Sequence, residues 1–147
     1  RPPSFREANV KALDTLGHSK PMRLQTWVWL IGLTDAPDSR VLESAQSFGS
    51  PPSMERLVGA RLETESFAPE RRAVRLVAES SSISMILRPA GVCVNPVFEI
   101  RNTPSRLVHV NLDESPLPSE NYAWDGKTLG LNATIRKPKK LQLDFSN

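Results

Sequence analysis

Short segments in which apolar and polar residues alternate constrain the fold of this chain more than any other feature. Alternation is clear in residues 57–67, 107–112, 127–135 and 141–145, and shorter segments that are mostly apolar cover residues 73–78, 83–87 and 97–100. A side-chain period of two puts successive residues on opposite faces, which is typical of a β-strand with one buried face. All 13 prolines fall outside these segments, where they mark turns. We therefore predict an all-β fold, an antiparallel β-sandwich of about eight to ten strands.

The turn signals indicate which strands pair. Ala68-Pro69-Glu70 separates residues 57–67 from residues 73–78, so these two segments predict a hairpin with a charged outer face. The sequence Asn102-Thr103-Pro104-Ser105 predicts a second hairpin, between residues 97–100 and 107–112. Residues 22–33 resemble a strand that is apolar on both faces. Such a strand is expected at the centre of a packed sheet or beneath a second domain.

At most one short helix is predicted, over residues 38–48. Asp38 or Ser39 can cap its start, and Gly49-Ser50-Pro51-Pro52 follows its end. Its apolar residues keep part of the spacing of a helix: Val41, Leu42, Ala45 and Phe48. An extended conformation of the same residues is the alternative, and residues 52–57 are open to a further short turn.

Length and cysteine content set the broad class of protein. A chain of 147 residues can bury a sufficient core as a single domain, residues 1–147, without a disulfide or a metal. Its one cysteine, Cys93, excludes an internal disulfide and lies between two valines, as expected of a buried structural thiol. The longest uncharged run, residues 24–34, is too short to span a bilayer. We expect no membrane span, no metal and no cofactor.

The chain begins with Arg1 rather than methionine. We therefore expect that a signal peptide, a tag or the rest of a larger protein has been removed upstream. The first of these would place the protein outside the cytoplasm, so we expect a secreted or periplasmic location.

The chain carries 19 Lys and Arg against 16 Asp and Glu, a formal net charge of +3. One dense basic patch is present, formed by Arg136, Lys137, Lys139 and Lys140. Lysine and arginine in such a run either bind a polyanion or lie solvated in a loop between strands. No aromatic residue is interleaved with the run, which argues against nucleic acid as a partner.

Aromatic residues are the candidates for sugar binding, because pyranose rings stack on them. The four candidates are Trp27, Trp29, Tyr122 and Trp124. Trp27 and Trp29 lie two residues apart on one face of a strand, as a flat platform would require. The alternative is that these rings anchor the core or a domain interface.

Evidence for catalysis is weaker. Neither a nucleotide-binding motif nor a nucleophile elbow occurs, and the two histidines, His18 and His109, lack a partner at metal-ligand spacing. Glu63 and Glu65 offer a pair of carboxylates, although exposed positions on a strand explain them equally.

Several short motifs carry a resemblance to a known module. They are Ser47–Pro52, Asn95–Asn102, Val108–Asn111, Asn121–Gly126 and Leu129–Leu131. Over residues 40–145 the chain resembles the C-terminal β-sandwich accessory module of large bacterial carbohydrate-active proteins, which include polysaccharide lyases and hydrolases. The resemblance implies a β-sandwich attached to a glycan-processing protein, and it supplies no catalytic residue.

Three functional hypotheses follow. The first is a non-catalytic module that packs against an adjacent domain of its parent protein or binds polysaccharide weakly. The second is a small glycan-active enzyme that uses carboxylates in a groove together with Tyr122 or His109. The third is a protein-interaction module that uses an apolar face or a sheet edge.

Overall fold

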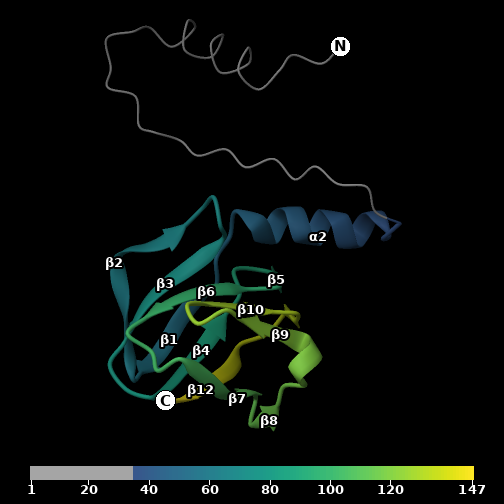
Figure 1. Cartoon of the computed structure of the whole chain (residues 1–147). Helices are drawn as coiled ribbons and strands as arrows, with labels where there is room; N and C mark the ends of the chain where they lie inside the picture. Colours follow the sequence, from purple (N-terminus) through teal and green to yellow (C-terminus); the bar gives the residue numbers. More distant parts are fainter. Residues whose placement is uncertain (1–34) are drawn as a thin grey trace, which may run out of the picture.

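Two five-stranded sheets face each other, and one helix lies along the edge of the sandwich (Figure 1). The computed structural model describes residues 35–147. The strand predicted at residues 22–33, with Trp27 and Trp29, lies outside the described residues.

Sheet A has the strand order β1-β4-β12-β7-β8. Its strands are β1 (Ser53–Val58), β4 (Ser82–Arg88), β12 (Lys139–Ser146), β7 (Arg106–Leu112) and β8 (Ser115–Pro116). Sheet B has the order β2-β3-β6-β10-β9. Its strands are β2 (Ala60–Ala68), β3 (Ala73–Ala78), β6 (Val97–Arg101), β10 (Thr128–Leu131) and β9 (Tyr122–Trp124). A small third sheet pairs β5 (Cys93–Val94) with β11 (Thr134–Ile135), and a 3-10 turn covers Ser119–Asn121.

The alternation in the sequence explains the core. In β4, Ile83, Met85 and Leu87 are buried while the residues between them are more exposed. The two sheets contribute their inward side chains to one hydrophobic cluster, and the largest fully buried members are Leu76, Ile83, Met85, Leu87, Phe98, Ile100, Leu129, Leu131, Ile135, Leu141 and Leu143. The prediction of an all-β sandwich is confirmed.

The helix prediction is confirmed as well, because α2 covers Asp38–Phe48. Its outer residues Val41 and Leu42 are exposed, whereas Ser47 near its end is buried. The hydroxyl oxygen Oγ of Ser47 accepts a hydrogen bond from the Val94 N–H at 2.8 Å. The end of α2 is therefore fixed to β5, and Figure 1 shows the helix lying beside that strand.

Two hairpins follow from local turn chemistry. Strands β2 and β3 pair as predicted. Strands β9 and β10 pair around Asp125 and Gly126, whose φ of +94° suits glycine. The Asp125 carboxylate accepts the backbone N–H groups of Thr128 at 2.6 Å and Lys127 at 2.9 Å, and these bonds lower the pKa of Asp125.

Other predicted strand pairs and turns are wrong. The hairpin between residues 97–100 and 107–112 does not form, because β6 belongs to sheet B and β7 to sheet A. The loop between them carries the chain across the core instead. The segment 57–67 is likewise divided at Gly59, where the chain passes from β1 in sheet A to β2 in sheet B. Residues 53–58 form strand β1 and not a short turn.

The strand pairing is antiparallel except between β3 and β6, which run parallel. Within residues 35–147 there are twelve strands, three of them two residues long, so nine longer strands match the expected number. No helix in this part of the chain has the length and apolar character to cross a membrane.

Candidate functional site

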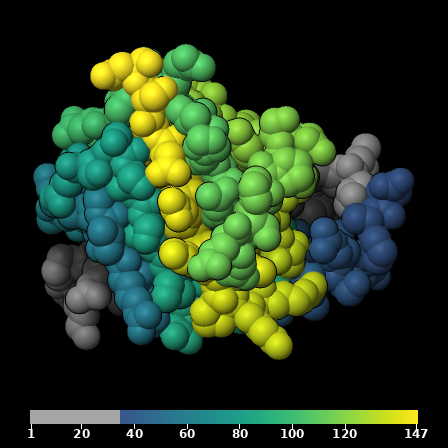
Figure 2. All heavy atoms as spheres, turned by 90° about the horizontal axis from the view of Figure 1, so that it is seen from below, coloured from purple at the N-terminus to yellow at the C-terminus, as the bar shows by residue number. Residues whose placement is uncertain are grey.

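The outer face of sheet A carries polar side chains in register across the strands. Pairing places Ser84, Gln142 and Asn111 side by side on β4, β12 and β7. Val58 of β1 and Pro116 of β8 extend this row to both edges of the sheet. Figure 2 shows this face, with β12 running through its middle. We call these three central residues, the amides of Gln142 and Asn111 together with the Ser84 hydroxyl, the amide row.

A second row lies next to the amide row. Asp144 of β12 pairs with Ser82 on one side and His109 on the other. The Ser82 hydroxyl donates to Asp144 Oδ1 at 2.6 Å, and the Gln142 amide nitrogen reaches Asp144 Oδ2 at 3.5 Å. The serine proton is thus directed to the carboxylate and not to His109. This arrangement is a hydrogen-bonding surface and differs from a nucleophilic triad, in which histidine takes the serine proton.

Three side chains on this face make no hydrogen bond within residues 35–147: Ser84, Asn111 and His109. Opposed residues of neighbouring antiparallel strands lie about 5 Å apart on the same face. Their donors and acceptors are therefore presented together to a ligand that crosses the strands.

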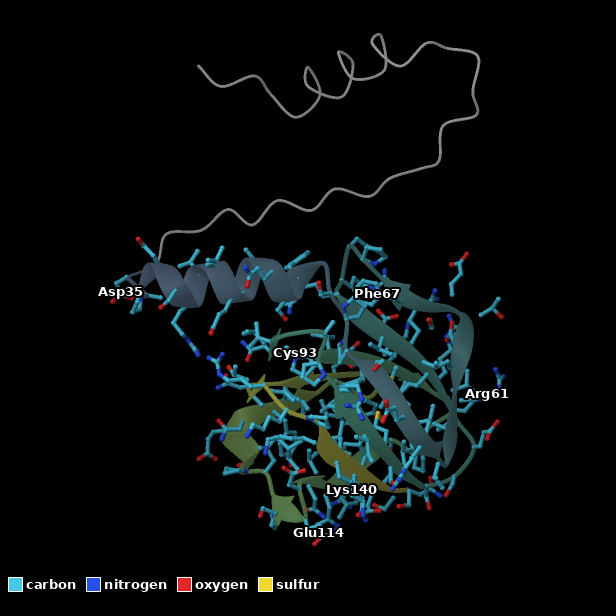
Figure 3. All side chains as sticks on the ribbon, turned by 180° about the vertical axis from the view of Figure 1, so that it is seen from behind. Asp35, Arg61, Phe67, Cys93, Glu114 and Lys140 are labelled. Carbon is cyan, nitrogen blue, oxygen red and sulfur yellow. The ribbon has the colours of Figure 1, made fainter. Side chains whose placement is uncertain are left out.

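A small pocket lies on the other side of the molecule, beside the end of α2. The loop after α2 contributes Phe48, Pro51 and Pro52, and the start of β6 contributes Pro96 and Val97. The sequence motifs Ser47–Pro52 and Asn95–Asn102 are thus brought together in space. Figure 3 shows two further lining residues, Phe67 near the end of the helix and Cys93 beneath it.

Three polar residues line the same pocket. The Ser47 hydroxyl is committed to the Val94 N–H, as described above. Burial raises the pKa of the Cys93 thiol, which Arg72 and Ser47 lower to a smaller extent, so the thiol stays protonated near neutral pH. The Arg72 guanidinium donates from Nη2 to the Val94 carbonyl at 2.7 Å and lies over the Phe48 ring, 4.8 Å from its centroid.

The aromatic residues Tyr122 and Trp124 lie two positions apart on β9 and pack against the core. The Trp124 ring is 5.4 Å from the Phe145 ring at an interplanar angle of 60°, and its indole nitrogen donates to the Ser105 carbonyl at 3.2 Å. These rings therefore have a packing role at the edge of sheet B. Sugar binding by Tyr122 and Trp124 stays a prediction.

The basic patch is divided among different partners. Arg136 forms a bidentate ion pair with Glu43 on α2, at 2.6 and 2.9 Å. Lys139 lies 2.6 Å from Asp113, and it is the main cause of the lowered pKa of that carboxyl. Lys137 and Lys140 are exposed and have no acidic partner within residues 35–147. The structure therefore does not gather the four charges into one cationic surface.

The outer face of sheet B carries a lattice of ion pairs. Arg75 lies within 3.6 Å of both Glu63 and Glu99, and Arg101 is 3.0 Å from Glu63. Arg71 forms a bidentate pair with Glu99 and lowers the pKa of that carboxyl. The Glu63 and Glu99 side chains are only 13% and 11% exposed. Glu63 is therefore a paired structural carboxylate rather than a solvated one.

Within the part of the chain that the structure describes, no three His, Cys, Asp or Glu side chains gather into a possible metal site. Sequence reasoning missed the polar rows of sheet A and Arg72. The outward residues were visible in the alternation of residues 82–88 and 139–146, but their register was not. Comparison of the chain with models of protein families, with curated proteins and with solved structures gives no match.

Proposed function

We propose that this chain is a non-catalytic accessory module of a glycan-processing protein and that it binds polysaccharide across the outer face of sheet A. The observation that carries the proposal is the amide row, with Asp144 and His109 beside it. Sugar hydroxyls both donate and accept hydrogen bonds. A surface of amides, hydroxyls and a carboxylate matches that chemistry, because it also offers both donors and acceptors.

The spacing of the face suits an extended ligand. Neighbouring strands lie about 4.8 Å apart, so the three residues of the amide row cover about 10 Å across the sheet. A short oligosaccharide segment lying perpendicular to the strands contacts all three. Val58, 63% exposed at one end of the row, adds an apolar contact for the ring faces of the sugar.

Two observations support a module without catalytic activity. A general acid needs a carboxyl with a raised pKa, whereas arginine or lysine partners lower the pKa of Glu55, Glu99 and Asp113. Tyr122 packs inward from sheet B and His109 faces outward from sheet A, so these two residues do not share a groove.

The expected affinity is weak. No tryptophan, tyrosine or phenylalanine ring of β1, β4, β12, β7 or β8 faces outward on sheet A, and hydrogen bonds to sugars replace hydrogen bonds to water. We expect a dissociation constant of about 1 mM, equivalent to about −4 kcal/mol.

Affinity electrophoresis of the full chain tests the proposal. Gels containing xyloglucan, mixed-linkage β-glucan or polygalacturonate are compared with gels lacking polysaccharide. At least one polymer should retard the chain, and Asn111→Ala and Gln142→Ala should each reduce that retardation. Asn132→Ala, at an exposed position outside sheet A, is the matched control and should leave it unchanged.

Two outcomes contradict the proposal. One is the absence of retardation by any of the three polymers. The other is retardation that Asn111→Ala and Gln142→Ala leave at the level of the control, which would place the binding surface elsewhere.

A further inference from the structure

The amide row has a charged residue on each side of it, and the two charges differ in sign. The outward side chains of β12 include Lys140, Gln142 and Asp144, which alternate with the buried Leu141 and Leu143. Successive outward residues of a strand lie about 6.8 Å apart. Lys140 therefore lies one row from Gln142 on one side, and Asp144 lies one row from it on the other.

The carboxylates beside Lys140 already have other partners. Glu55, in the same row of sheet A, forms a bidentate pair with Arg88, at 2.6 and 3.0 Å. Asp113 lies 2.6 Å from the Lys139 ammonium group and accepts only the backbone N–H of Lys140, at 2.9 Å. Within residues 35–147 the Lys140 ammonium group has no hydrogen-bond acceptor of its own. This side of the amide row thus keeps one uncompensated positive charge.

The opposite side of the amide row keeps a negative charge. Asp144 bonds to the neutral groups of Ser82 and Gln142, and no cation in the described part of the chain forms an ion pair with it. A ligand carboxylate above the amide row is therefore attracted towards Lys140 and repelled by Asp144. The two charges favour an anionic ligand in a single orientation.

The neighbour of Lys140 on β4 is apolar. Ile86 pairs with Lys140 and is half-buried on the outer face. Such a neighbour supports the aliphatic stem of a lysine while its ammonium group stays in solvent. The flexible stem lets the charge meet a group that lies over the adjacent row.

We propose that the polysaccharide bound by the amide row is acidic, with a uronate carboxylate on Lys140 and sugar hydroxyls on Gln142 and Asn111. This inference rests on the proposed function and adds to it the chemical class of the polymer. A uronate carries its carboxylate one bond outside the ring. The carboxylate thus reaches the row of Lys140 while the ring hydroxyls stay on the amides. A neutral sugar offers the ammonium group only a hydroxyl, which is a weaker partner.

An NMR titration of the full chain with three trisaccharides tests the class of ligand. Trigalacturonate carries carboxylates, its methyl ester has the same sugars without charge, and cellotriose is a neutral glucan. The signals to follow are the backbone amides of Lys140 and Gln142 and the side-chain amides of Gln142 and Asn111. Trigalacturonate should bind about threefold more tightly than its ester, as expected for one exposed ion pair. Raising NaCl from about 50 to about 500 mM should remove that difference.

Variants separate the position of the charge from its presence. Lys140→Gln should weaken trigalacturonate about threefold and leave the ester unchanged, whereas Lys140→Arg keeps the charge and should keep the binding. Arg106→Gln is the matched control, because it removes an equal charge from an exposed position on the same face, three rows away. It should leave the binding of trigalacturonate unchanged. Dispersed amide spectra establish that each variant is folded.

Three results would overturn the inference. The first is an absence of saturable shifts with trigalacturonate, and the second is equal binding of trigalacturonate and its ester. The third is an equal loss in Lys140→Gln and Arg106→Gln, which would assign the effect to net charge. In each case the proposed function still holds if a neutral polymer retards the chain and Asn111→Ala reduces that retardation, and it fails if no polymer does.

Discussion

Gly59 is the residue at which the chain leaves sheet A for sheet B, and its replacement by alanine tests the geometry of that crossing. Its φ is +78°, and an added Cβ would lie 2.0 Å from the Ser82 carbonyl oxygen. The Gly59 carbonyl also accepts the backbone N–H groups of Glu79 and Ser80, at 2.8 and 3.1 Å. A side chain here must therefore displace the start of β4 or the β3–β4 turn.

The magnitude has two parts. A left-handed conformation costs a non-glycine residue about 1–2 kcal/mol. Relieving a contact with backbone atoms adds a comparable amount, since neither strand can move without disturbing its partners. We expect Gly59→Ala to lower the free energy of unfolding by about 3 kcal/mol. With a urea dependence of about 1.5 kcal/mol per molar, the unfolding midpoint falls by about 2 M.

Two other glycines supply matched controls. Gly126 has a φ of +94° but open space around its Cβ position, so Gly126→Ala should cost only the backbone strain, about 1–2 kcal/mol. Gly49, with a φ of −91° and open space, should accept alanine with a gain of about 0.4–1 kcal/mol through the unfolded state.

Urea unfolding of the full chain, followed by far-UV circular dichroism, measures the series. The expected order of stability is Gly49→Ala, wild type, Gly126→Ala and then Gly59→Ala. If Gly59→Ala is no less stable than Gly126→Ala, the close approach of Ser82 to the crossing is incorrect, and with it the position of β4 against β1.

Three further predictions concern the pocket and the ion-pair lattice. Ser47→Ala leaves the buried Val94 N–H without its acceptor and should cost about 1–3 kcal/mol in urea unfolding. Arg71 holds the pKa of Glu99 below its ordinary 4.5, so this carboxylate stabilises the fold above that pH and the contribution is lost as the pH falls. In Glu99→Gln, the free energy of unfolding measured with urea should therefore decrease less between neutral and acidic pH. Cys93 is 2% exposed with a raised pKa, so a thiol reagent at pH 8 should label the native chain far more slowly than the urea-unfolded chain.

Local signals in the sequence were sufficient for the helix and for hairpins closed by short turns. The boundaries of α2 agree with the predicted range, because a proline precedes the helix and a glycine and two prolines follow it. The β2–β3 hairpin was predicted for a similar reason, since Pro69 marks its turn. In both cases the decisive interactions lie within a few residues.

The choice between pairing and crossing was not available from the sequence. The loop between β6 and β7 looks like a hairpin turn, yet β6 pairs with β3 and β10 and β7 pairs with β12 and β8. An alternating strand buries its apolar face in the core whichever of the two sheets it joins, so the alternation does not choose between the sheets. Contacts distant in sequence decide between the two arrangements.

The candidate sites could not be predicted from the sequence either, because they too depend on contacts between residues distant in sequence. Polar residues at 82, 84, 109, 111, 142 and 144 are ordinary outward positions of three separate strands, and only the register of those strands sets them in rows. Arg72 carried no signal at all, because its importance comes from Phe48 and Val94, which lie more than twenty residues away on either side.

The position of the amide row bears on how weak binding to polysaccharide becomes useful. The pocket lies beside α2, and the amide row lies on the face seen from below in Figure 2. Attachment to the proposed parent protein would leave the row open and would hold it at a high local concentration near its polymer. An affinity of about 1 mM is adequate under that condition.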